Sequence, residues 1–180
     1  NKFIGHLRGT QKVVAITAST GIAATHMNGM TIHSWSGLGI KEDISDSDIK
    51  NLIKKKYLFK RIRKTNVLII DEVSMLKPGQ FDAVERICRY FKASFLPFGG
   101  MQVVLSGDFF QLPPIDRGGG QVSFITDSAA WKNLDMKVCY LEGQFRHQDE
   151  KLGALLESIR DNDIDLAKNI LQARIYADMR

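Results

Sequence analysis

The sequence has few cysteines and no long apolar run, and each absence excludes a class of protein. Only Cys88 and Cys139 occur among the 180 residues, without CxxC spacing. A disulfide scaffold or a four-cysteine zinc site is therefore not expected, and we predict two reduced core thiols. The longest purely aliphatic runs span four residues, whereas a transmembrane helix needs ~20. A membrane-spanning protein is therefore not expected.

Glycine and proline are also scarce, at 19 residues together, which excludes collagen-like and Pro/Gly-rich disordered chains. Hydrophobic residues make up 44% and charged residues 25% of the chain, as in an ordinary globular protein with a real core. The net charge of +5 weakly favours an anionic partner. Segment 54–64 holds seven Lys/Arg and no Asp/Glu. This segment is either a solvated face or a flank that contacts phosphates.

Four short apolar segments indicate strands that are buried on both faces, as in a parallel sheet. They are rich in β-branched residues and do not alternate with polar ones. The gaps between them are long enough for crossover helices. The segments are Val13–Thr17, Val67–Asp71, Val103–Gly107 and Val138–Glu142. Because ligands bind at the carboxyl ends of parallel strands, the residues that follow each segment are the site candidates.

Apolar residues at helical spacing predict helices around these strands. The expected helices are Ser47–Arg63 with a basic outer face, Gly79–Ala93, Glu150–Arg160, and a last helix capped by Asp163. Residues Asn1–Leu7 are interpreted as the tail of a further helix.

Two adjacent carboxylates, Asp71 and Glu72, stand at the end of the second segment. Such a pair is costly at an apolar strand end unless positive charge lies nearby, and a Mg²⁺-nucleotide supplies it. Asp71 would then hold the metal through water, and Glu72 would polarise the water that attacks the γ-phosphate. An acidic helix start that stabilises the helix dipole is the structural alternative.

The third segment is followed by SGDFFQLPPI, in which two prolines stiffen a loop. Gln111 can donate to a phosphate oxygen and orient water, so it can report the nucleotide state. Phe109 and Phe110 are candidates for stacking on bases. The alternative is a structural turn with two core aromatics.

Small hydroxyl and glycine residues follow the first segment. They let the protein backbone approach a ligand closely, and they fit contacts to a nucleic-acid backbone. These are Ser19, Thr20 and Gly21, with Thr17 at the end of the segment itself, and then Thr31, His33 and Ser34. His33 alone would more often be a core or cap residue. Arg146, after the fourth segment, is either a bidentate phosphate donor or an ordinary surface arginine. The sequence has no GxSxG motif, which disfavours a Ser-His-Asp hydrolase.

Several ordered motifs together resemble the petite-integration-frequency (PIF) family of superfamily 1B DNA helicases. The match is collinear over roughly Val13–Glu150, and TIHS, PFGG and GDFFQLPP in this order separate it from generic P-loop ATPases. The pieces are TASTGIAA (Thr17–Ala24), MTIHSWSGLGI (Met30–Ile40), LIIDEVSML (Leu68–Leu76), SMLKPGQFDAVERICRYF (Ser74–Phe91), PFGGMQVVLSGDFFQLPPI (Pro97–Ile115) and LEGQFRHQDE (Leu141–Glu150).

The resemblance implies an α/β, RecA-like P-loop NTPase fold, with a mostly parallel sheet flanked by helices. Residues 1–137 would be an incomplete first RecA-like domain (1A), and residues 138–180 the beginning of the second (2A). It implies an ATP-dependent 5′→3′ DNA helicase motor that uses ATP and Mg²⁺ in genome maintenance. Its partners would be single-stranded and duplex or forked DNA, with no membrane, and the intact protein would be a monomer. It would work inside the cell, in the nucleus or mitochondrion of a eukaryote or the cytoplasm of a bacterium.

Site roles also follow from the resemblance, residue by residue. Asp71, Glu72, Gln111 and Arg146 would be the catalytic and nucleotide-binding residues, with Asp71 holding Mg²⁺ through water. Thr17, Thr20, Gly21, Thr31, His33, Phe109 and Pro113 would lie along DNA. Arg86 and Arg89, in the stretch after the acidic pair, are expected to pair with acids.

The chain departs from the family pattern because it has no GxxxxGK[ST] loop. That loop is expected just before Asn1, and without it the β- and γ-phosphates lack most of their cradle. We therefore interpret the chain as a helicase fragment that alone hydrolyses little or no ATP. One alternative is a non-catalytic nucleic-acid-binding or interaction module that has lost the loop. A metal-dependent hydrolase that uses Asp71 and Glu72 is a weaker alternative, since no group of His, Asp and Glu residues has the sequence spacing typical of metal ligands.

Overall fold

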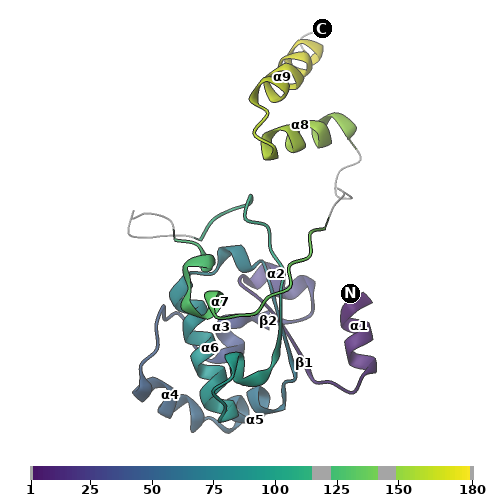
Figure 1. The fold of residues 1–180 in the computed structure, drawn as a ribbon. Coiled ribbons are helices and arrows are strands. Elements are labelled where there is room, and N and C mark those ends of the chain that lie inside the picture. Colours follow the sequence, from purple (N-terminus) through teal and green to yellow (C-terminus); the bar gives the residue numbers. More distant parts are fainter. Residues whose placement is uncertain (1, 115–122, 142–148, 179–180) are drawn as a thin grey trace. The chain divides into compact units, whose positions relative to one another are not determined.

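The computed structural model describes residues 2–114, 123–141 and 149–178 (Figure 1). The chain divides into two compact units, Asn1–Asp135 and Met136–Arg180. In the described parts of the chain, no helix combines the length and apolar character needed to cross a membrane.

A four-stranded, all-parallel sheet forms the centre of the larger unit, with the order β2-β1-β3-β4. Its strands are β1 (Val14–Ala18), β2 (Met30–Thr31), β3 (Val67–Asp71) and β4 (Gln102–Leu105). Three of the four predicted segments are thereby confirmed as neighbouring parallel strands, with small shifts in their bounds.

The fourth predicted strand is wrong for the described residues, 138–141, which form no strand and are exposed. Leu141, for example, is 97% exposed. An apolar, β-branched segment becomes a strand only where a neighbour pairs with its backbone, and here none does. Cys139 in this segment is exposed, so the prediction of two core thiols holds only for Cys88. Burial raises the pKa of the Cys88 thiol well above its usual range.

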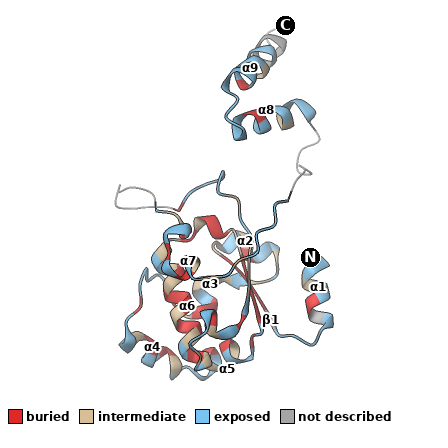
Figure 2. Cartoon of the chain, in the orientation of Figure 1, coloured by how far each residue is buried: buried red, intermediate tan, exposed pale blue. Residues whose placement is uncertain are grey.

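Helices cover both faces of the sheet (Figures 1 and 2). Alternate residues of β3 point to opposite faces. Leu68 and Ile70 join the main core, while Val67 and Ile69 join a smaller cluster with Leu7 of α1 (Lys2–Gly9). The main core is built with α3 (Ile32–Ser36), α4 (Asp46–Ile53), α5 (Lys56–Lys64), α6 (Pro78–Lys92) and α7 (Ala129–Lys132). A short helix, α2 (Gly21–His26), connects β1 to β2.

The single helix predicted over Ser47–Arg63 is wrong, because α4 and α5 are separated by a break at Lys54 and Lys55. In one continuous helix, Leu58 would point about 180° away from Ile49, since each residue turns by about 100°. Both side chains are nevertheless buried in the same core, at 0% and 1% exposed. The break re-aims the second helix so that its apolar side also faces the core.

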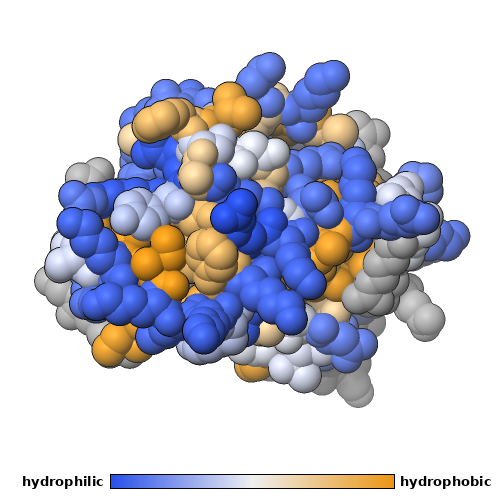
Figure 3. All heavy atoms as spheres, turned by 90° about the horizontal axis from the view of Figure 1, so that it is seen from below, coloured by the Kyte–Doolittle hydropathy of each residue, from blue (hydrophilic) through white to orange (hydrophobic). Residues whose placement is uncertain are grey.

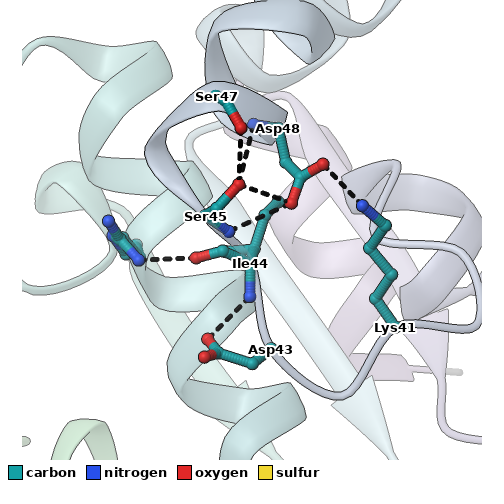
Figure 4. A network of polar contacts seen from close by, with 7 residues as sticks. Lys41, Asp43, Ile44, Ser45, Ser47 and Asp48 are labelled. Atoms are coloured by element: carbon teal, nitrogen blue, oxygen red, sulfur yellow. Dashed lines mark hydrogen bonds and ion pairs between the residues drawn. The ribbon is translucent and has the colours of Figure 1, made fainter.

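A capping box fixes the start of α4 (Figure 4). The Ser45 hydroxyl accepts from the Asp48 backbone N–H at 3.2 Å, and the Asp48 carboxylate accepts from the Ser45 N–H at 3.1 Å. The Lys41 ammonium donates to the same carboxylate, and this bond, with the Ser45 donors, lowers the pKa of Asp48 to about 2. These contacts hold the chain that enters α4.

The PFGG motif forms a 3₁₀ turn, η2 (Pro97–Gly100), which packs on α6 and leads into β4. Phe98 is fully buried, and its ring centre lies 5.2 Å from that of Phe81. The Glu85 carboxylate accepts from the Phe98 N–H at 3.3 Å. Gly99 has a φ of 67°, and a Cβ there would lie 2.8 Å from the Cys88 carbonyl oxygen, so only glycine fits. In this structure the motif therefore positions β4.

The second unit contains α8 (Glu150–Arg160) and α9 (Ile164–Asp178), which pack on each other. The bounds of α8 match the prediction. The predicted cap is also confirmed, because the Asp163 carboxylate accepts from the Leu166 N–H at 3.0 Å.

Candidate functional site

The carboxyl ends of the four strands meet at one edge of the larger unit. Ala18 at the end of β1 lies opposite Thr31 of β2 on one side and Asp71 of β3 on the other. Beyond the end of β4, the Ser106 N–H donates to the Ile70 carbonyl at 3.0 Å. The segments that follow all four strands therefore begin side by side, at the place where open parallel sheets bind ligands. We call this place the carboxyl edge.

Asp71 and Glu72 stand at the centre of the carboxyl edge, and both are half-buried. Glu72 has a φ of 51°, in the left-handed region that a non-glycine residue adopts at a cost of about 1–3 kcal/mol. The Val73 N–H, which donates to the Ser106 carbonyl at 2.9 Å, helps to hold this turn. Neither carboxylate accepts a hydrogen bond from another described residue. Both are therefore open to a hard cation or to water, which fits the carboxylate oxygens that Mg²⁺ prefers.

Gly107 brings the loop after β4 against the turn that carries Glu72. A Cβ at Gly107 would lie 3.0 Å from Cγ1 of Val73 and 3.1 Å from the Val73 backbone nitrogen. Only a residue without a side chain fits there unless the neighbours shift. The loop after β4 and the Glu72 turn are therefore closely packed at Gly107.

The predicted sensor residue, Gln111, lies in the loop after Gly107 and is exposed. Its side-chain amide donates to the Asp108 carboxylate at 3.3 Å, and its backbone N–H donates to the Asp108 carbonyl at 3.2 Å. The same carboxylate accepts from the Phe110 N–H at 3.0 Å. Asp108 thus organises the loop and holds the Gln111 side chain close to the backbone.

The two phenylalanines of this loop differ in their surroundings. Phe109 is 41% exposed and packs edge-on against Trp131, with ring centres 6.1 Å apart, and against Phe124 at 6.3 Å. Phe110 is 74% exposed, and Pro113 is also exposed. Phe109 therefore anchors the loop as well as presenting part of its ring. No local signal identified Trp131 as its partner, because the two residues are far apart in sequence.

The hydroxyl residues predicted to lie along DNA are used in different ways. Thr17 is fully buried, and its hydroxyl donates to the Ile69 carbonyl at 2.6 Å, so a DNA contact by its side chain is not compatible with this fold. Thr17 was predicted at the end of the first strand, and in that strand its hydroxyl bonds the neighbouring strand β3. Thr20 and Thr31 cap the starts of α2 and α3 at the carboxyl edge, at 3.3 and 3.2 Å. Gly21 is exposed there, and His33 is half-buried.

Three arginines were singled out in the sequence. The prediction that Arg86 and Arg89 pair with acids is confirmed, because Arg86 binds Asp46 and Arg89 binds Glu85. Arg146 lies outside the described residues, so its predicted place beside the nucleotide stays a prediction. No cluster of three or more His, Cys, Asp or Glu side chains among the described residues is arranged to hold a metal ion.

Two buried hydroxyls at the carboxyl edge have no hydrogen-bond partner among the described residues. They belong to Ser19, which follows β1, and Ser74, two residues after Glu72. Most buried side-chain hydroxyls in folded proteins have a hydrogen-bond partner, so two unpartnered ones at the same edge are uncommon. Ser74 was not predicted as a site residue, although it lies in two of the motifs quoted above, LIIDEVSML and SMLKPGQFDAVERICRYF.

Comparison with known proteins finds one family model, PIF1-like helicase, which matches residues 1–176. The ATP-dependent DNA helicase Pif1 of a Psychrobacter strain is 45% identical over 190 residues, covering 99% of this chain. The crystal structure of Pif1 helicase from Candida albicans is 37% identical, with a TM-score of 0.81 over 88% of the chain. That of the Bacteroides Pif1 helicase with ADP-AlF3 and single-stranded DNA is 31% identical, with a TM-score of 0.72 over 83%.

The chain spans about a third of the length of these proteins. It covers 29% of the Psychrobacter protein, 36% of the Candida structure and 37% of the Bacteroides structure.

Proposed function

The chain belongs to the PIF1-like helicase family, and we propose that it is part of the motor of an ATP-dependent DNA helicase. Its fold is the RecA-like α/β fold of its structural neighbours. One observation carries the proposal: the Glu72 turn and the Gln111 loop lie against each other through Gly107 at the carboxyl edge. A nucleotide-dependent motor needs such contact between the groups that cleave ATP and a loop that moves.

The acidic pair would act on Mg²⁺ and ATP. When ATP is bound, the phosphorus of its γ-phosphate is the electrophile that water would attack. Asp71 would hold the metal through water, and Glu72 would orient the attacking water and accept its proton. Gln111 would exchange its bond with Asp108 for one to the γ-phosphate, so that the loop changes conformation when phosphate leaves. Arg146 would supply a second γ-phosphate contact from the following domain.

The same loop would pass this change to DNA. Phe109 and Pro113 lie within a few residues of Gln111, so we propose that they contact the strand together with Thr20, Gly21, Thr31 and His33. The Bacteroides relative was crystallised with single-stranded DNA, which supports this class of partner. We propose 5′→3′ movement on single-stranded DNA and unwinding of duplex or forked DNA in genome maintenance, inside the cell.

The two compact units would belong to different motor domains. We propose that the unit Asn1–Asp135 is part of domain 1A and that the following unit begins domain 2A, close to the boundary predicted at residues 137 and 138.

Strand separation by the full-length protein tests the proposed function. With ATP and Mg²⁺, we expect it to unwind a duplex that carries a 5′ single-stranded tail and to leave one with only a 3′ tail intact. Absence of ATP-dependent unwinding on both substrates would contradict the proposal.

Replacing Gln111 with alanine tests the coupling role of its loop. The Gln111→Ala variant of the full-length protein should bind single-stranded DNA within about twofold of wild type, because Gln111 is not proposed to touch DNA. Unwinding per ATP hydrolysed should fall about tenfold. This corresponds to a rise of about 1.4 kcal/mol in the activation free energy of the coupled step. Both rates are measured on the same forked substrate. A wild-type ratio of unwinding to hydrolysis would refute the role.

A further inference from the structure

The positive charge of the chain is concentrated in one short segment. Residues 54–64 hold seven of the 25 basic residues and none of the 20 acidic ones. The rest of the chain therefore has 18 basic against 20 acidic residues, so the net positive charge comes from this segment. A cluster of this kind on one helix is the electrostatic footprint of a polyanion contact.

The structure places most of these charges on the outer side of α5 and on the two residues just before it. Its apolar residues Leu58 and Ile62 are fully buried, while the cationic side chains around them are exposed. We call the exposed set the basic face: Lys54, Lys55, Lys56, Lys60, Arg63 and Lys64. On the helix, residues 56, 60 and 64 are four apart and lie along one stripe.

Among the residues that the structure describes, no acidic group forms an ion pair with this face. Three acids that precede it in sequence are paired elsewhere: Asp46 binds Arg86, Asp48 binds Lys41, and Glu42 binds Lys77. Lys55, Lys56 and Lys60 form no ion pair with any described residue. Cations that lack an acidic partner are available to a ligand.

An exposed aromatic ring lies within the basic face. Tyr57 is 60% exposed, and the Arg61 guanidinium lies 5.6 Å from its ring centre. Arg61 also donates to the carbonyls of Ser34 and Trp35, at 3.1 and 3.2 Å, which ties α5 to the end of α3. An exposed aromatic ring among cations is typical of a surface that binds nucleic acid.

The basic face lies at the opposite end of the sheet from the proposed nucleotide site. Thr65 and Asn66 connect α5 directly to the start of β3, and the Asn66 side chain accepts from the Val13 N–H at 2.9 Å. Five-residue strands separate this amino edge from the carboxyl edge by ~16 Å. Figure 3 views the end at which α4 and α5 lie in Figure 1, where hydrophilic side chains surround small apolar patches.

We propose that the basic face binds the phosphate backbone of a second DNA segment, distinct from the strand at the carboxyl edge. The inference rests on the proposed function, since a forked substrate offers a duplex and a second tail besides the strand on which the motor moves. The charge, the lack of acidic partners among the described residues and the exposed Tyr57 ring favour nucleic acid over an acidic protein.

A triple substitution in the full-length protein tests this surface, in which Lys55, Lys56 and Lys60 each become glutamine. Glutamine keeps a similar helix propensity, and all three positions are exposed, so thermal unfolding should be unchanged. We expect affinity for a forked duplex with two long tails to fall about tenfold and the slope of log K against log salt to decrease by about 2. Affinity for a short single strand and DNA-stimulated ATP hydrolysis should stay within about twofold.

A matched control removes the same charge elsewhere, by Lys132→Gln, Lys137→Gln and Lys151→Gln, and should leave the salt slope for the fork unchanged. An unaltered slope in the basic-face variant would overturn the proposal and leave the face to solvent or an acidic protein. Equal losses for fork and short strand would also overturn it, since the face would then belong to the first DNA site. A wild-type protein that fails to unwind DNA but shows the slope difference would contradict only the proposed function.

Discussion

Replacing Glu72 with glutamine is expected to lower DNA-stimulated ATP hydrolysis by the full-length protein at least ~100-fold, the contribution of a positioned general base. Glutamine has nearly the same shape, so the left-handed backbone at this position, with its φ of 51°, would be strained to the same extent. What changes is the ability to accept a proton from water. Binding of ATP and DNA should therefore stay within a few-fold of wild type.

Steady-state ATP hydrolysis and equilibrium binding of a fluorescent ATP analogue separate these effects. Glu157→Gln on α8 provides the control, because Glu157 is an exposed glutamate whose carboxylate has no hydrogen-bond partner among the described residues. Hydrolysis by the Glu72 variant within tenfold of wild type would show that another group activates the water.

Replacing Phe81 with alanine is expected to destabilise the protein by about 3–5 kcal/mol, the cost of removing a buried phenylalanine. Phe81 is fully buried between two other aromatic residues. Its ring centre lies 5.2 Å from that of Phe98 and 6.2 Å from that of Trp131. Trp131 in turn packs against Phe109 of the proposed coupling loop. A cavity at Phe81 therefore loosens both the turn before β4 and the anchor of that loop.

Urea-induced unfolding of the full-length protein measures this loss as a decrease in the midpoint. Phe95→Ala is the matched control, because Phe95 is 99% exposed, and its midpoint should change by less than the equivalent of ~0.5 kcal/mol. If Phe81→Ala unfolds the protein during preparation, Phe81→Leu should give a smaller, measurable decrease. A Phe81 variant as stable as the Phe95 variant would contradict this packing.

The sequence predicted those elements whose apolar pattern is itself the cause of their structure. Val67–Asp71 begins with four consecutive aliphatic residues, and it forms an inner strand with the predicted bounds. Glu150–Arg160 has regular helical spacing and forms α8. The acidic pair and the glutamine loop were also expected at one edge, because parallel strands place their carboxyl ends together.

The remaining features depend on tertiary contacts that no local pattern encodes. The two-residue strand Met30–Thr31 is too short to show periodicity and exists because β1 offers it an edge. Thr17 was predicted at the end of the first strand and along DNA, but its hydroxyl is buried and donates to β3. The break between α4 and α5 follows from where their apolar side chains must point. The contact of Phe109 with Trp131 joins residues far apart in sequence.

A crystal structure of the full-length protein with Mg²⁺ and a non-hydrolysable ATP analogue tests the central claim most directly. The account predicts that the γ-phosphate lies at the carboxyl edge, with Asp71 on a water that coordinates the metal, Glu72 beside the position of the attacking water, and the Gln111 amide on a phosphate oxygen. A nucleotide bound at another surface, or a carboxyl edge that does not contact the triphosphate, would contradict it.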